Sequence, residues 1–112
     1  MHVHLLTCHD LNALSHDDII WQKQLEQAGH YVTVGIWGTD IHHTKDTVVV
    51  IRSCWDYIDD VRGFCSWLDS LQCKVWNPAV LVKWNSDKLY LRDLQQLGVD
   101  IVPTVFDGKP PV

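Results

Sequence analysis

The feature that most constrains the fold is a run of four β-branched residues, Val48-Val49-Val50-Ile51, near the middle of the chain. A strand that alternates apolar and polar residues has one face in water, whereas a continuous apolar run is typical of a strand buried on both faces. Strands of this kind occur mostly in parallel sheets, because crossover helices then cover both faces. The run therefore predicts an interior parallel strand in an α/β domain.

Helical and strand patterns alternate on both sides of this run. Two strands are expected before it, over residues 3–8 and 31–37, with a helix between them. After it, residues 61–71 carry an apolar stripe at helical spacing, and residues 74–76 form a short strand. This order predicts a Rossmann-like parallel sheet with helices on both faces and the strand order 2-1-3-4.

The start of the first helix is marked by Ser15, three residues before Asp18. This spacing predicts a capping box of the acidic type. In such a box the hydroxyl accepts from the backbone of the fourth residue, and the acidic side chain reaches back to the first. Trp21 and Leu25 then fall on one face of the helix, and Gly29 ends it.

The C-terminal third carries weaker signals. Asn77, which precedes a proline, is expected to start a helical turn, because Asn caps well and Pro suits the first helical position. Asn85 or Ser86 is expected to cap a last helix through Leu97, followed by a short strand over 99–102.

Composition excludes several classes of protein. The 112 residues suffice for one domain with one modest core. A net charge of −5, with nine scattered basic residues, argues against nucleic-acid binding. No apolar run approaches the ~20 residues of a membrane span. The four cysteines form no Cys-x-x-Cys pair and suit small buried thiols in a reducing compartment, so a cytoplasmic protein is expected.

Two kinds of cofactor site are also argued against. The loop over residues 9–16, after the first strand, contains no glycine, so a dinucleotide pyrophosphate would lack its close backbone approach. Among the seven histidines, His2 and His4 alternate on one strand face, and no pair has the spacing of a helical zinc site. No metal site is therefore expected.

The segment after the buried strand has the strongest functional signal, because ligands of open parallel sheets bind beyond the carboxyl ends of the strands. Arg52 supplies a fork of donors for a carboxylate or phosphate, and Ser53 adds a hydroxyl. Trp55 and Tyr57 would form the walls of a substrate-binding pocket, and Asp56 would orient Arg52 or accept from a substrate amine. The alternative is an Arg–Asp pair and aromatics that only fasten a loop, and composition alone favours that reading.

Five short motifs carry a family likeness: Val-Ile-Arg-Ser-Cys-Trp-Asp-Tyr at 50–57, Phe-Cys-Ser-Trp-Leu at 64–68, Val-Trp-Asn-Pro at 75–78, Lys-Trp-Asn-Ser-Asp-Lys at 83–88 and Val-Pro-Thr at 102–104. In this order and separation they resemble ATP-grasp proteins of the glutathione-synthetase-like branch. The resemblance is strongest to the group that includes the cycloserine-forming ligase, and it spans nearly the whole chain.

The resemblance implies a pre-ATP-grasp domain over residues 1–84 and the start of the ATP-grasp region over 85–112. Such ligases join a carboxylate to an amine through an acyl-phosphate, and two later subdomains hold ATP and Mg²⁺. By the same resemblance, Lys88 matches a lysine that contacts ATP phosphates, and the substrate is a small amino-acid or peptide-like molecule. Because the other ATP and metal ligands lie downstream in the family, this chain alone is expected to be inactive and to bind no cofactor tightly.

Two positions depart from the family pattern: Cys54 stands where Thr is usual, and Ile58 where His is frequent. An alternative function is a stand-alone binding module of the same fold without catalysis. That module would use an exposed apolar face around Trp84 to form a homodimer or bind a partner. A third reading, a small metal or redox protein, requires a Cys/His cluster in space.

Overall fold

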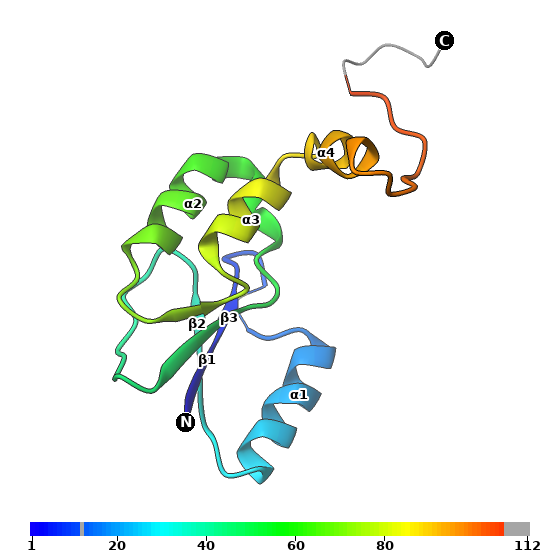
Figure 1. The fold of residues 1–112 in the computed structure, drawn as a ribbon. Coiled ribbons are helices and arrows are strands. Elements are labelled where there is room, and N and C mark those ends of the chain that lie inside the picture. Colours follow the sequence, from blue (N-terminus) through cyan, green and yellow to red (C-terminus); the bar gives the residue numbers. More distant parts are fainter. Residues whose placement is uncertain (12, 107–112) are drawn as a thin grey trace. The chain divides into compact units, whose positions relative to one another are not determined.

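The computed structural model describes residues 1–11 and 13–106, and its described part contains a four-stranded, wholly parallel sheet (Figure 1). The strands are β1 (His2–Thr7), β2 (Tyr31–Ile36), β3 (Thr47–Ile51) and β4 (Lys74–Trp76). Their order is β2-β1-β3-β4, and each neighbouring pair is parallel. The predicted fold class and strand order are therefore confirmed.

The helices α1 (His16–Gln27) and α2 (Val61–Ser70) lie on opposite faces of this sheet (Figure 1). On the α1 face, Val3 and Leu5 of β1 form a core cluster with Leu14 and Val32, and Leu25 of α1 packs against it. The buried side chains of α2 are those of Phe64 and Leu68, and each is 2% exposed.

Burial within the sheet is deepest on β1 and not on the β-branched run. Every residue of β1 is buried, whereas in β3 only Thr47 and Val49 are. Val48 and Val50 remain half-buried. The run does form an interior parallel strand, but only Val49 of its four residues is fully buried.

The start of α1 follows the sequence signal in part. Ser15 is the N-cap, and its hydroxyl accepts from the backbone N–H of Asp18 at 3.3 Å. The Asp18 carboxylate does not accept from the backbone N–H of Ser15, so of the predicted capping box only the half supplied by Ser15 forms. The carboxylate is instead engaged by residues that follow β3, namely Arg52 and Ser53.

A 3₁₀ helix, η1 (Trp55–Asp60), leads from the end of β3 into α2. Asp60 caps α2, and its carboxylate accepts from the backbone N–H of Gly63 at 2.9 Å. The predicted second helix is thus confirmed, with its last residue at Ser70.

The C-terminal region differs from the prediction. The helical turn expected from Asn77 extends into a full helix, α3 (Ala79–Ser86), and the expected last helix starts later than predicted, as α4 (Tyr90–Gln96). Asn85 and Ser86 lie in the last turn of α3 and do not cap α4. The strand expected over 99–102 does not form, and the backbone N–H of Val99 instead donates to the carbonyl of Leu94 at the end of α4.

The chain divides into two compact units, residues 1–79 and 80–112, and each is described by itself. The boundary at residue 84 stays a prediction about where the pre-ATP-grasp domain ends. Residues 107–112 of the predicted C-terminal region lie outside the described part. Over residues 1–11 and 13–106, none of the helices has the length and apolar character needed to cross a membrane.

Candidate functional site

The polar segment after β3 is fastened to the carboxyl end of β1. The backbone N–H groups of Arg52 and Ser53 both donate to the carbonyl of Leu6, at 3.3 and 3.2 Å. This places the two side chains at the sheet edge where β1 and β3 end, next to the start of α1. The predicted position of these residues is therefore confirmed.

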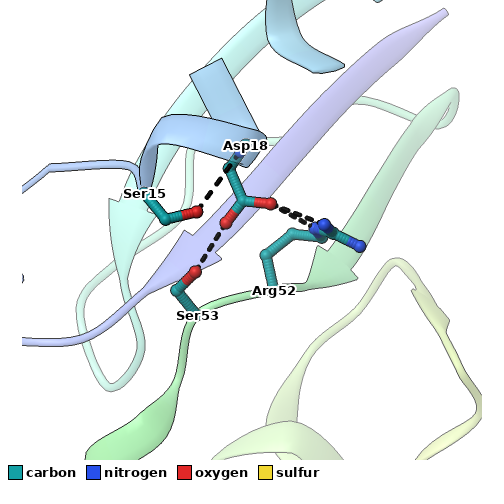
Figure 2. A network of polar contacts seen from close by, with 4 residues as sticks. All are labelled: Ser15, Asp18, Arg52 and Ser53. Atoms are coloured by element: carbon teal, nitrogen blue, oxygen red, sulfur yellow. Dashed lines mark hydrogen bonds and ion pairs between the residues drawn. The ribbon is translucent and has the colours of Figure 1, made fainter. Parts of the chain in front are cut away.

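Asp18 joins the two side chains into one network (Figure 2). Arg52 Nε donates to Asp18 Oδ1 at 2.6 Å, and Arg52 Nη2 contacts the same oxygen at 2.6 Å. Ser53 Oγ donates to Asp18 Oδ2 at 2.5 Å. The Asp18 side chain is only 2% exposed, whereas that of Arg52 is 39% exposed. The buried Asp18 carboxylate thus binds the Arg52 guanidinium, while the arginine side chain remains partly exposed to solvent.

The environment favours the ionised form of Asp18. Burial alone would raise the pKa of this carboxyl. The contacts with Ser53, Arg52 and Ser15, together with the positive charge of Arg52, outweigh burial and lower the pKa below its ordinary value. The ion pair is therefore intact at neutral pH.

A surface pocket of about 370 Å³ opens beside Arg52. The guanidinium carbon lies 5.0 Å from the centroid of the Trp21 ring, a cation–π arrangement. Trp21 and Ile20 are 36% and 51% exposed, so α1 leaves apolar surface uncovered here. The pocket combines a cation, a carboxylate and apolar walls, and its lining residues are Asp17, Ile20, Trp21, Gln24 and Arg52.

Asp56 has partners other than the predicted one. Its Oδ1 accepts from the indole Nε1 of Trp37 at 2.7 Å, and its Oδ2 accepts from the backbone N–H of His9 at 3.3 Å. Asp18 is the carboxylate that orients Arg52, so the suggestion that Asp56 does so is wrong. Asp56 ties together the segments that follow β1, β2 and β3, which agrees with the loop-fastening interpretation for this residue.

The aromatic residues of the segment separate into two groups. The ring centroid of Tyr57 lies 5.5 Å from that of Phe64, which also packs edge-to-face against Trp37 at 5.2 Å. Tyr57 therefore belongs to the packing between η1 and α2. Trp55 is 62% exposed and does not line the pocket beside Arg52.

Cys54 is poorly suited to nucleophilic chemistry. The thiol is 4% exposed and donates to the carbonyl of Thr7 at 3.7 Å. Burial raises its pKa to about 12, so almost no thiolate exists at neutral pH. At this position the side chain acts as a small buried packing group.

Lys88 belongs to the second unit and lies in the turn between α3 and α4, not in the first turn of a helix. Its Nζ is 5.6 Å from the ring centroid of Tyr90. In the same unit, the Trp84 indole donates to Asp93 Oδ2 at 2.7 Å. Lys88 and Arg52 therefore belong to different units of the chain.

Metal-ligating side chains do not converge within residues 1–11 and 13–106: no three His, Cys, Asp or Glu side chains there are arranged to hold an ion. His2 contacts the hydroxyls of Thr33 and Thr47, at 2.6 and 2.9 Å, and His4 contacts Thr33 at 2.7 Å. These imidazoles are part of a buried network within the sheet.

Sequence reasoning missed the role of Asp18, although the signal was available. In a parallel sheet, the helix that follows β1 begins at the carboxyl edge of the sheet. An acid in its first turn therefore faces the residues that follow β3. Ser15 and Asp18 were interpreted only as the start of a helix. The same position at the start of the helix also brings the Asp18 carboxylate to Arg52.

Comparison with known proteins gives a consistent result. The family model described as the D-cycloserine synthetase DcsG N-terminal domain matches residues 3–77. No curated protein matches the chain. Among solved structures, the crystal structure of D-cycloserine synthetase DcsG matches with a TM-score of 0.70 and 26% identity. The match covers 92% of this chain but only 36% of the DcsG chain. The chain therefore belongs to the family of D-cycloserine synthetase DcsG N-terminal domains.

Proposed function

We propose that this chain is the N-terminal, substrate-side domain of an ATP-dependent carboxylate–amine ligase of the ATP-grasp type, and that it is not catalytic alone. The observation that carries the proposal is the family match over residues 3–77. The site geometry supports it, because a partly exposed arginine is fixed at the sheet edge where ligands of open parallel sheets bind.

Each residue of the site is assigned a role from its chemistry and its contacts. Arg52, held by Asp18, binds an oxyanion of an amino-acid or peptide-like substrate, and Ser53 completes the hydrogen bonding of Asp18. Asp56 and Tyr57 hold the segment that follows Arg52 through their contacts with Trp37 and Phe64, and the exposed Trp55 is available to a part of the substrate that extends beyond the pocket. In the complete enzyme ATP with Mg²⁺ supplies the phosphoryl group, and Lys88 contributes a cation for its phosphates. We place the protein in the cytoplasm, since its four cysteines are free thiols.

The test uses the protein translated from the complete reading frame that contains these residues. ADP release is measured with ATP, Mg²⁺ and a panel of amino acids and dipeptides. We expect release that depends on one member of the panel. Arg52→Ala should lower kcat/KM by about 10- to 100-fold, the loss of one charge-assisted hydrogen-bonding group.

The control for this variant is Arg62→Ala, which removes an exposed arginine from α2 and should leave kcat/KM unchanged. The proposal fails if no compound in the panel stimulates ADP release, or if Arg52→Ala behaves like Arg62→Ala.

A second candidate, a stand-alone binding module, is favoured by the exposed apolar side chains of the second unit. Val80, Leu97 and Val102 are 76%, 78% and 78% exposed. A stand-alone module would cover these side chains with another polypeptide, as proteins do with contiguous exposed apolar patches. Analytical ultracentrifugation distinguishes the candidates: a self-contained module forms a homodimer, whereas a ligase domain separated from its other domains stays monomeric.

A further inference from the structure

We propose that Asp18 is the positioning residue of this site: it fixes the Arg52 guanidinium through one edge and thereby presents the opposite edge, above Trp21, to an oxyanion of a ligand. The biological role of the site rests on the proposed function. The geometry itself belongs to residues 1–79 and does not depend on any ATP chemistry.

The first argument is how the donors of Arg52 are distributed. Nε and Nη2 both face Asp18 Oδ1, and no acceptor in the described part of the chain reaches Nη1. Figure 2 shows this outer nitrogen turned away from the carboxylate. Guanidinium groups bind carboxylates and phosphates through two parallel N–H donors. The edge that remains open carries such donors.

The second argument is that the orientation is over-determined. Ser53 holds one oxygen of Asp18, and Arg52 holds the other, so the carboxylate has no freedom to turn. The Trp21 ring supports the guanidinium from α1, with 5.0 Å between the guanidinium carbon and the ring centroid. An arginine side chain loses much rotamer freedom on binding a ligand. Fixing it in advance removes that cost from the binding free energy.

The third argument concerns charge. The Asp18 carboxylate neutralises Arg52, and Asp17 lines the same pocket. A dianionic phosphate would therefore meet a like charge, whereas a monocarboxylate meets less repulsion. A carboxylate that also carries an ammonium group finds a partner for each charge. The oxyanion chemistry is common to these ligands, and separate probes distinguish them.

The experiment uses the 112-residue chain with ¹⁵N-labelled arginine. The sequence has arginines at 52, 62 and 92, so three Nε–H signals are expected, and Arg52→Lys identifies one of them. We expect the Arg52 Nε–H to exchange with water at least ten times more slowly than in the Asp18→Asn variant. Asp59→Asn removes an exposed carboxylate of η1 that does not line the pocket and should leave this exchange rate unchanged.

Ligand binding is measured on the same signals with sodium acetate, glycine and inorganic phosphate as probes. We expect acetate and glycine to shift the Arg52 signal, glycine at the lower concentration, and phosphate least. Asp18→Asn should weaken glycine binding about tenfold while the amide spectrum of the sheet is retained. Asp18→Glu should restore part of the loss, and Ser53→Ala, which leaves the charge in place, should weaken binding two- to threefold.

A merely structural Asp18 would lower thermal stability in Asp18→Asn yet leave glycine binding unchanged, and that result overturns the proposal. It is equally overturned if no probe shifts the Arg52 signal in the unmodified chain. If Asp18→Asn does not fold, Ser53→Ala decides, and unchanged binding in that variant counts against the proposal. None of these readouts requires ATP turnover, so failure here is distinct from failure of the ligase proposal.

Discussion

Among single residues, Asp56 illustrates how a side chain in a candidate pocket serves the fold. It accepts from the Trp37 indole at 2.7 Å and from the His9 backbone at 3.3 Å. Asp56→Ala would leave the part-buried indole N–H without its acceptor, which costs about 1–3 kcal/mol. Urea unfolding followed by tryptophan fluorescence measures this loss. Asp59→Ala, at an exposed position of the same 3₁₀ helix, should change the free energy of unfolding by less than about 0.5 kcal/mol.

The buried imidazoles of β1 make a second prediction at this scale. His4 Nδ1 and His2 Nε2 both contact the single hydroxyl of Thr33. His4 Nε2 is buried without a partner in the described part of the chain, and a Cβ at Gly35 would lie 2.7 Å from it. One chain of donors satisfies the neutral rings: His4 Nδ1–H to Thr33, and the Thr33 hydroxyl to His2. A proton added to either ring breaks this chain or leaves a buried N–H⁺ unpaired.

Stability should therefore fall in acid. Burial lowers the pKa of His2, assisted by the nearby His42 and the N-terminal ammonium, and burial and His2 lower the pKa of His4. Because the unfolded chain binds these protons more readily, the contribution is complete above pH 6.5 and is lost as the pH falls below it. The loss is at most about 1.4 kcal/mol per pH unit for each proton. Urea unfolding at pH 7.5 and 5.5 measures it.

His4→Leu tests this assignment, because it should reduce the difference in unfolding free energy between the two pH values. The exposed His16 provides the control, and His16→Gln should leave that difference as it is in the unmodified chain. An equal pH dependence in all three proteins would contradict the assignment to the buried ring.

For the elements, the cap of α1 links local sequence to the site. Ser15 Oγ accepts from the backbone N–H of Asp18, so it stabilises the turn that holds the Asp18 carboxylate. Ser15→Ala should lower the free energy of unfolding by about 0.5–2 kcal/mol and raise the hydrogen-exchange rates of the first turn of α1. Ser66→Ala, on the exposed side of α2, is the matched control. An equal effect of the two substitutions would show that Ser15 is not an important cap.

Features that are determined by residues close together in the sequence could be predicted, whereas contacts between distant residues could not. The β-branched run at 48–51 and the helical stripe after it were enough to predict the strand order. Alternating strands and helices form parallel sheets, and their crossover connections are right-handed. The start of α4 was misplaced, because Asn85 and Ser86 are residue types that favour a helix start but lie here in the last turn of α3. The partner of Asp56 is Trp37, 19 positions away and directly after β2, and no short-range pattern in the sequence indicates that pairing.

On the scale of the whole molecule, the burial pattern divides the chain unequally. Every buried apolar residue of the described part lies between Val3 and Leu68, within the unit of residues 1–79. That unit also contains all four strands of the sheet and the Asp18–Arg52 network. Over residues 80–106, no side chain is classed as buried. Hydrophobic burial is the main favourable contribution to folding, so the first unit holds nearly all of the folding free energy.

A chain of residues 1–79 should therefore fold by itself, while a peptide of residues 80–112 should not. We expect the ¹H–¹⁵N spectrum of the shorter chain to reproduce the sheet amides of the whole protein. We also expect its urea midpoint to differ little, since residues 80–106 contain no buried side chain. The 80–112 peptide should show a random-coil spectrum, because its two short helices fall below the length at which isolated helices are stable in water. Loss of cooperative unfolding in the 1–79 chain would mean that the second unit supplies essential stabilising contacts, and that the first unit is not an independent folding unit.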